Sequence, residues 1–313
     1  MLTLDAEEVR RRLPWPALTE ALRAMFRDGC AAPLRHRHPL PQQDAAEGSL
    51  LLMPAWQAGR YTGVKIVHVA PGNAARGLKA VHAVYVLSDG ETGVPIAMLD
   101  GGELTDRRTA AASLLAAGYL ARPDSRRLLL LGSGRVAAAL AEAYADRFDL
   151  SDIAIWSRRE TQAAALARRL AGHGLPARAV ARAEPGEADI IAAATLATQP
   201  LLRGGEVRAG THVDLVGAFR PDMREADAAL LAGARLVVDT RVGALAEAGD
   251  LVQAMAEGVF GPGHIAAELS ELCQGTAEGR QDPAQVTVFK SVGWAGEDLA
   301  AAVLACGTSR EKS

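Results

Sequence analysis

The 313-residue sequence has few cysteines and no long hydrophobic run. The three cysteines, Cys30, Cys273 and Cys306, are odd in number and far apart, which argues against a disulfide framework and against a CxxC zinc pattern. No apolar stretch approaches the ~18 residues that a membrane span needs. The first residues also lack the basic start and apolar core of a signal peptide. We therefore expect a cytoplasmic protein with reduced thiols and no membrane partner.

The sequence also has no large excess of positive or negative residues. Lysine and arginine number 34 and aspartate and glutamate 37, a net charge of −3 that offers no electrostatic footprint for nucleic acid. His36 and His38 would share one face of a strand. No cluster of Cys, Asp or Glu nearby completes a metal site, so we expect no metal. The length and ordinary hydrophobic content instead indicate a globular protein with one large domain or two.

The stretch 127–159 has the pattern of a dinucleotide-binding βαβ unit. A buried run of four leucines is followed at once by G-x-G-x-x-A, then by an amphipathic helix and a second apolar run. The first glycine permits a tight turn, the second permits close approach of a pyrophosphate, and the helix N-terminus attracts the phosphates. A glycine-rich turn can also be merely structural. The predicted cofactor contacts are Gly132, Ser133, Gly134, Arg135 and Val136.

The residues that follow the second apolar run bear on the choice of cofactor. An NAD-selective site usually carries Asp or Glu there to bind the ribose 2′-hydroxyl. This chain carries Ser157, Arg158 and Arg159, and a hydroxyl with guanidinium groups can hold a 2′-phosphate. Ser157 could also simply cap the next helix. We predict that NADP(H) is preferred and that NAD(H) is possible.

Three further apolar runs, at 188–195, 211–217 and 234–240, alternate with helical segments, as in a doubly wound parallel sheet. Ligands bind such sheets at the carboxyl ends of the strands. We therefore add Thr195, Val216 and Gly217 to the predicted cofactor contacts.

The N-terminal part has a different pattern. Two short helices, the first capped by Asp5, precede a series of strands separated by turn signals, which indicates a mostly antiparallel sheet. The expected strands are 50–53, 61–69, 80–87 and 95–99. The fold class is therefore α/β: a Rossmann doubly wound parallel sheet domain plus an α+β domain with a mostly antiparallel sheet.

Two cations stand out in this part. Lys65 lies within an apolar strand, where it could reach solvent along its alkyl chain or project into a pocket as a cation. Thr105 is expected to cap a helix whose first turn contains Arg107 and Arg108. Cations are disfavoured at a helix N-terminus. These arginines could pair with Glu103 or Asp106, or could help an anion bind there.

Several motifs, taken together, resemble the ornithine cyclodeaminase/μ-crystallin family over nearly the whole chain. In the N-terminal half the matching segments are 52–55 (LMPA), 63–65 (GVK), 71–73 (PGN) and 104–111 (LTDRRTAA). In the C-terminal half they are the glycine loop, 188–191 (ADII) with Thr195, 216–218 (VGA), 223–225 (MRE), 247–250 (EAGD) and 288–293 (VFKSVG).

The resemblance implies a homodimer formed through the antiparallel-sheet domain, which would comprise residues 1–121 and 291–313. A Rossmann domain, 122–290, would be inserted before the last helix, with the site in the cleft between the domains. By motif, Arg35, Lys65 and Arg108 would hold a substrate carboxylate, although Arg37 is a near neighbour of Arg35. This implication favours the anion-binding alternative for Arg108. Lys65 and Arg108 would also act in catalysis, with Lys65 polarising an imine or relaying its proton.

The chain departs from the cyclodeaminases of that family at two positions. The acids that would handle the amines of ornithine are replaced by Leu51 and Phe219, and an ammonium buried without a carboxylate is costly. The leading hypothesis is an NAD(P)H-dependent reductase of a cyclic imine carboxylate, such as Δ1-pyrroline-2-carboxylate to L-proline. The alternatives are ornithine cyclodeamination, alanine dehydrogenation, and a non-enzymatic protein that binds NADPH and a small ligand. The expected partner is thus a small imino or amino acid.

Overall fold

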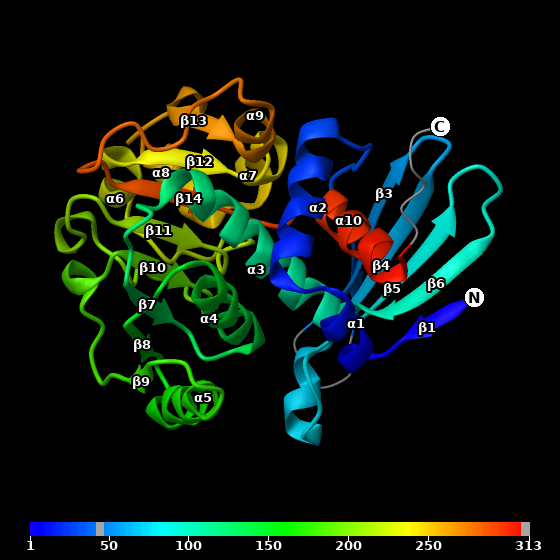
Figure 1. Cartoon of the computed structure of the whole chain (residues 1–313), viewed down its shortest axis with the longest axis horizontal. Helices are drawn as coiled ribbons and strands as arrows, with labels where there is room; N and C mark the ends of the chain where they lie inside the picture. Colours follow the sequence, from blue (N-terminus) through cyan, green and yellow to red (C-terminus); the bar gives the residue numbers. More distant parts are fainter. Residues whose placement is uncertain (42–46, 308–313) are drawn as a thin grey trace. The chain divides into compact units, whose positions relative to one another are not determined.

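The computed structural model describes residues 1–41 and 47–307 and divides into two compact units (Figure 1). Unit 1 contains residues 1–108 and the described residues from Trp294 onward, and unit 2 contains Thr109–Gly293. The first division therefore falls inside a helix, α3 (Gly101–Leu120), and the second directly before the last helix.

Unit 1 contains a six-stranded sheet in the order β1-β6-β5-β4-β3-β2. All neighbours are antiparallel except β1 and β6, so the prediction of a mostly antiparallel sheet is confirmed. Strand β1 was not predicted, because three residues give too short a pattern. The strands are β1 (Leu2–Leu4), β2 (His36–Leu40), β3 (Gly48–Gln57), β4 (Tyr61–Val69), β5 (Val81–Asp89) and β6 (Pro95–Asp100).

The helices of unit 1 include α1 (Ala6–Arg12), α2 (Trp15–Asp28) and α10 (Ala295–Cys306), with the 3₁₀ turn η1 (Pro71–Arg76). Asp5 caps α1 as predicted, since its side chain accepts a hydrogen bond from the amide of Glu8. Helix α10 packs against α2 and against β3, β4 and β5 (Figure 1). It therefore lies on the face of the sheet that carries Met53, Lys65 and Tyr85, which are side by side in the strand register.

Helix α3 begins earlier than the sequence indicated. Its first residue is Gly101, and Asp100 accepts a hydrogen bond from the amide of Glu103. Thr105 is therefore not the N-cap; inside the helix, its hydroxyl donates to the carbonyl of Gly101 at 2.7 Å. Arg107 and Arg108 consequently lie beyond the first turn, so the expected conflict with the helix dipole does not arise.

Unit 2 contains an eight-stranded, entirely parallel sheet in the order β13-β12-β14-β11-β10-β7-β8-β9. The direction of strand order reverses between β7 and β10, which is where doubly wound sheets bind ligands. This confirms the Rossmann-like part of the fold prediction. The strands are β7 (Arg127–Leu131), β8 (Asp152–Trp156), β9 (Ala177–Ala179), β10 (Ile190–Ala193), β11 (His212–Leu215), β12 (Arg235–Val238), β13 (Ile265–Glu268) and β14 (Thr287–Lys290).

The helices of unit 2 other than α3 are α4 (Arg135–Arg147), α5 (Glu160–Gly172), α6 (Ala228–Gly233), α7 (Arg241–Glu247), α8 (Gly249–Ala256) and α9 (Leu269–Gln274). Short 3₁₀ turns lie at η2 (Pro185–Glu187), η3 (Gly204–Glu206) and η4 (Pro262–His264). The cap position of α5 is Arg159 and not Ser157. The Ser157 hydroxyl instead accepts a hydrogen bond from the amide of Arg159 at 3.2 Å, one residue before the helix begins.

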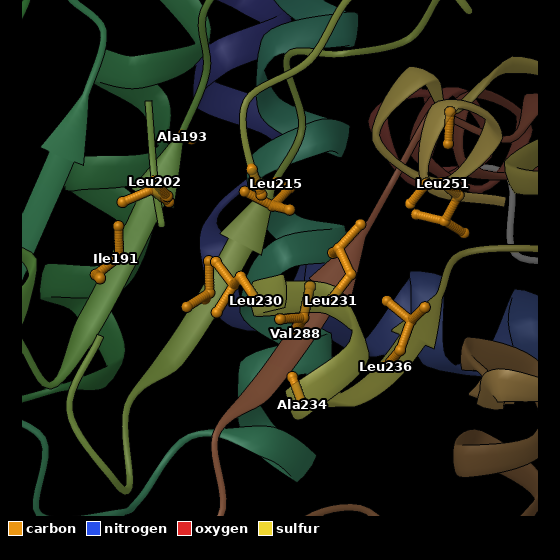
Figure 2. Close-up of a cluster of buried hydrophobic side chains, with 14 of the residues drawn as sticks. Ile191, Ala193, Leu202, Leu215, Leu230, Leu231, Ala234, Leu236, Leu251 and Val288 are labelled. Carbon is orange, nitrogen blue, oxygen red and sulfur yellow. The ribbon is translucent and has the colours of Figure 1, made fainter. Parts of the chain in front are cut away.

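An apolar core packs α6, α7 and α8 on the parallel sheet. Figure 2 shows Ile191, Leu215 and Val288 on neighbouring strands beside Leu230 and Leu231 of α6. All five side chains are at most 3% exposed. Strands buried on both faces read as continuous apolar runs, which is why β7, β10 and β12 could be predicted from sequence.

Candidate active site

Lys65 lies at the centre of a charged cluster in unit 1. Its side chain is 2% exposed, so it does not reach solvent. Its Nζ atom donates a hydrogen bond to Oδ1 of Asp298, on α10, at 2.8 Å. Burial, followed by the nearby charge of Arg108, lowers the pKa of Lys65 to about 8, while Asp298 acts in the opposite direction. Of the two alternatives for Lys65, the structure supports a cation held inside the protein.

Arg108 joins the same cluster. Its Nε atom donates to Oδ1 of Asp298 at 3.0 Å, and its Nη1 atom donates to Oε2 of Glu297 at 2.6 Å. Arg107 behaves differently, because its guanidinium donates to the carbonyl of Leu13 and stacks 3.8 Å above the ring of Trp15. Arg107 therefore has a packing role, and Arg108 is the arginine that meets Lys65.

Arg35 directly precedes β2 and is partly buried. If the register of β2 with β3 is extended by one residue, Arg35 lies beside Met53, which itself pairs with Lys65. The charge of Arg35 contributes to lowering the pKa of Lys65. Arg37, by contrast, is exposed and donates to the hydroxyl of Ser49 at 3.3 Å. The structure thus brings Arg35 near Lys65.

The two carboxylates of this cluster were not predicted from the sequence. Glu297 and Asp298 occupy the first turn of α10 and are both fully buried. Acids in a first helical turn ordinarily complement the helix dipole, so their position gave no reason to expect cationic partners. Only the packing of α10 on the sheet brings them to Lys65 and Arg108. No local signal could have identified them.

Tyr85 is a further residue that the sequence analysis did not single out. It pairs with Lys65 in the sheet, and its hydroxyl has no hydrogen-bond partner within the described residues. Gly63 makes room for it, because a Cβ atom there would lie 2.0 Å from the Tyr85 hydroxyl. Any larger residue at the glycine position of the G-V-K segment would therefore clash with Tyr85. The hydroxyl is a buried polar atom beside the cation cluster.

In unit 2, the glycine loop has the geometry of a phosphate cradle. Gly132 has φ +119°, and a Cβ atom there would lie 2.6 Å from the carbonyl oxygen of Ala194, so a larger residue would clash. Helix α4 begins after Gly134, a cap residue that has no side chain to bond the first-turn amides. Arg135 is exposed and Val136 partly buried. A helix N-terminus of this kind, directly after a glycine loop, is the arrangement that binds a dinucleotide phosphate.

The Ser157 segment lies beside this loop. The Ser133 hydroxyl donates to that of Ser157 at 3.0 Å, so the structure brings these two predicted contacts together. Arg158 and Arg159 are exposed. Within residues 1–41 and 47–307, neither guanidinium forms an ion pair. This donor set fits an anionic group at the carboxyl end of β8.

The three contacts predicted at the carboxyl edge also lie together. Thr195 follows β10, and its methyl carbon lies 3.6 Å from the position that a Cβ atom of Gly132 would occupy. Val216 and Gly217 follow β11, and the amide of Val216 donates to the carbonyl of Ala193. The glycine loop and the ends of two neighbouring strands thus form one edge of unit 2.

The two positions that depart from the cyclodeaminase pattern are apolar in different settings. Leu51 lies on the same face of β3 as Met53, and Phe219 is 38% exposed in the loop after β11.

The histidines considered as metal ligands, His36 and His38, are exposed on β2. In the part of the chain that the structure describes, no group of three or more His, Cys, Asp or Glu is placed to hold a metal. None of the described helices is long and apolar enough to cross a bilayer.

Comparison with known proteins gives matches along the whole chain. The model of the ornithine cyclodeaminase/mu-crystallin family matches residues 4–312. A Δ1-pyrroline-2-carboxylate reductase of Paracoccus denitrificans is 41% identical over 287 residues, 88% of this chain and 90% of that protein. The structure of the corresponding Thermococcus litoralis reductase, in complex with NADH and L-proline, matches with a TM-score of 0.92 at 33% identity, over 98% and 97% of the two chains. An archaeal alanine dehydrogenase dimer with bound NAD matches with a TM-score of 0.88 at 30% identity, over 98% and 95%.

Proposed function

Because the chain belongs to the ornithine cyclodeaminase/mu-crystallin family, we propose that it is an NAD(P)H-dependent oxidoreductase that reduces a C=N bond beside a carboxylate. The leading reaction is Δ1-pyrroline-2-carboxylate to L-proline. The observation that carries the proposal is the buried cluster of Lys65, Arg108 and Asp298. Two relatives named above act on or bind molecules of this kind.

The charges of this cluster fit an anionic substrate. Lys65, Arg108 and the nearby Arg35 supply three positive charges, and Glu297 and Asp298 supply two negative ones. Cations therefore outnumber carboxylates among these five residues, so the cluster can attract an anion. A substrate carboxylate has the required charge, and guanidinium and ammonium groups are its preferred partners. We assign carboxylate binding to these three cations.

The reduction needs a hydride at carbon and a proton at nitrogen. When bound, a reduced nicotinamide supplies the hydride. Lys65 is the proposed proton donor, because its pKa of about 8 makes its ammonium more acidic than an ordinary lysine and close to neutral pH. Asp298 then holds Lys65 in place through the 2.8 Å hydrogen bond. Imine, reduced cofactor and proton are thus converted to amine and oxidised cofactor.

The side chains at Leu51 and Phe219 argue against ornithine as substrate. A second amine would need a carboxylate partner, and the resemblance places the cyclodeaminase acids at these two positions. An apolar side chain at each position instead favours a compact, uncharged ring. Ornithine cyclodeamination is therefore the second candidate and is tested directly below.

For the cofactor, we propose that NADP(H) is preferred over NAD(H). Arg158 and Arg159 are exposed cations at the carboxyl end of β8, beside the Ser157 hydroxyl, and no acid occupies these three positions. A 2′-phosphate would gain charge-assisted hydrogen bonds there. The related structures named above contain NADH or NAD, so the preference is a proposal about this chain's own residues.

We further propose a cytoplasmic homodimer formed through the sheet of unit 1. The sheet face opposite Lys65 carries partly exposed apolar residues on adjacent strands. They are Leu52, Pro54, Val64, Ile66, Val84, Val86 and Met98. Contiguous apolar surface of this kind marks an interface, and the alanine dehydrogenase named above is a dimer. Light scattering of the wild type and of Ile66→Glu tests this, with a dimer and a monomer expected.

One assay tests the proposed reaction. The purified protein is mixed with Δ1-pyrroline-2-carboxylate and NADPH or NADH, and separately with ornithine and NAD. Oxidation of NADPH with formation of proline is expected. Release of ammonia from ornithine would support the cyclodeaminase instead, and turnover of pyruvate with ammonia would support an alanine dehydrogenase. Binding of NADPH without turnover of any imine would indicate a non-enzymatic binding protein.

A further inference from the structure

Three segments that carry the family resemblance have no part in the site described so far. Each contributes one charged side chain that is 0% exposed: Glu225, Asp250 and Lys290. Charged side chains are almost never fully buried unless they are paired. Their burial therefore calls for an explanation.

Glu225 connects the loops that follow β10 and β11. Its Oε1 atom accepts hydrogen bonds from the amide and hydroxyl of Thr195, at 2.7 and 2.8 Å. Its Oε2 atom accepts one from the amide of Gly217 at 2.8 Å. Bonds to an ionised acceptor are stronger than neutral ones, and more so in a buried site. One carboxylate thus fixes two of the predicted cofactor contacts.

Asp250 and Lys290 hold Glu225 in turn. Oδ1 of Asp250 accepts hydrogen bonds from the amides of Glu225 and Ala226, at 2.7 and 2.9 Å. Nζ of Lys290, at the end of β14, lies 3.2 Å from the other oxygen of Asp250. Burial raises the pKa of Glu225, and the positive charge of Lys290 opposes this rise. The three segments therefore form one buried charged network.

Gly217 shows how closely this network is packed. A Cβ atom there would lie 2.2 Å from Oε1 of Glu225 and 2.2 Å from the carbonyl oxygen of Thr195. Both distances are far below van der Waals contact, and one of the atoms belongs to the backbone, which cannot easily move. The glycine of the V-G-A segment is thus required by the backbone of Thr195 together with the side chain of Glu225.

The position of the two loops indicates which part of a dinucleotide they serve. In doubly wound sheets the adenosine ribose binds at the end of the second strand, here β8, and the ligand crosses the point where strand order reverses. The loops after β10 and β11 lie on the other side of that point. They are therefore on the side of the nicotinamide.

We propose that Glu225 is a positioning residue for the nicotinamide half of the cofactor, and that Asp250 and Lys290 hold it in place. The proposal rests on the proposed dinucleotide site. Glu225 does not touch the cofactor; it acts by fixing the backbone at Thr195 and Gly217. Loss of the Glu225 charge should weaken binding of the nicotinamide half of the cofactor. Binding at the glycine loop should be unchanged.

The test is Glu225→Gln. The glutamine side chain has the same size as that of glutamate. Its NH₂ group, however, would point at the backbone N–H of Thr195 or of Gly217, both of which donate to Glu225. The probes are NADPH and adenosine 2′,5′-bisphosphate, which lacks the nicotinamide half, and binding is followed by fluorescence and calorimetry. The Kd for NADPH should rise about 10-fold, as for loss of a buried charge-assisted bond, and the Kd for the bisphosphate by less than about 2-fold.

The matched control is Glu257→Gln. Glu257 pairs with Arg224, the residue next to Glu225, but is half-exposed, and both Kd values should stay at the wild-type level. If Glu225→Gln does not fold, Thr195→Val takes its place, which removes one of the three hydrogen bonds. Equal weakening of both probes, or no weakening of NADPH binding, would overturn the positioning role. Failure of the wild type to bind any dinucleotide would instead overturn the proposed function.

Discussion

Lys65 and Asp298 form a buried ion pair, with Nζ 2.8 Å from Oδ1, although 233 residues separate them in the chain. The same oxygen accepts a hydrogen bond from Arg108. One carboxylate of the last helix therefore holds two of the three cations predicted to bind the substrate, Lys65 and Arg108.

Lys65 should make carboxylate binding depend on pH. Its pKa, lowered to about 8 by burial, means that the free protein carries the ammonium below pH 8 and loses it above. Affinity for furan-2-carboxylate, a planar ring acid with no titratable nitrogen, should fall as pH rises through about 8. Lys65→Met should bind weakly at every pH, and Lys65→Arg should move the fall to higher pH. Titration calorimetry between pH 6.5 and 9.5 in saturating NADP⁺ measures this. A pH-independent affinity in the wild type would contradict the assignment.

Arg108 should act on the substrate and not on the cofactor. Arg108→Lys keeps the charge but loses the planar fork, so KM for the imine should rise about 10-fold or more while the Kd for NADPH is unchanged. Arg108→Ala should also reduce stability by about 3–5 kcal/mol, because Glu297 and Asp298 would lose a buried partner. Steady-state kinetics and urea unfolding separate the two effects. A parallel rise in the Kd for NADPH would show that Arg108 serves the cofactor.

Arg158 and Arg159 should determine the cofactor preference. Replacing both by Ala should raise the Kd for NADPH about 10-fold or more and leave the Kd for NADH within about 2-fold, since only NADPH carries the 2′-phosphate. Arg168→Ala is the matched control, because this exposed arginine lies on α5 just beyond the segment. Fluorescence titration gives the ratio of the two Kd values. An unchanged ratio in the double variant would refute the role.

Asp214 should make unit 2 less stable as pH rises. It is fully buried on β11, where burial raises its pKa from 3.8 to about 7, and it accepts a hydrogen bond from Tyr144 at 3.1 Å. The folded protein therefore holds a proton between pH 4 and 7 that the unfolded chain releases. Stability should fall by about 1.4 kcal/mol per pH unit over that range and stay level above it.

Asp214→Asn removes this proton while keeping an acceptor for Tyr144. The free energy of unfolding of the variant, relative to that of the wild type, should rise from pH 5 to pH 7 and change little from pH 7 to pH 8. Urea unfolding at these three values measures the difference. The exposed Asp222→Asn serves as control and should follow the wild type. Parallel stability curves for the wild type and Asp214→Asn would rule out an elevated pKa.

Much of the fold could be predicted from local patterns. The leucine run of β7 and the glycine loop after it identified the parallel sheet, because a strand buried on both faces is apolar throughout. The short strands β1, β9 and β13 escaped prediction, since each has at most four residues and lies at or near a sheet edge. The start of α3 was misplaced because Thr105 and Asp100 are both good caps, and only the structure shows which one is used.

Local sequence patterns were sufficient to identify the glycines of the G-x-G-x-x-A loop, the arginines at positions 158 and 159, and Lys65 in an apolar strand. Those properties follow from local chemistry and spacing. Which charged side chains contact one another depends on the tertiary structure. Asp298 reaches Lys65 through the packing of α10 on the sheet, and Glu225 reaches Thr195 and Gly217 because β10 and β11 are neighbours. A charged side chain that is buried away from water is costly unless it is paired with another polar group. The identity of that partner cannot be predicted from the local sequence, because the partner is distant in the chain.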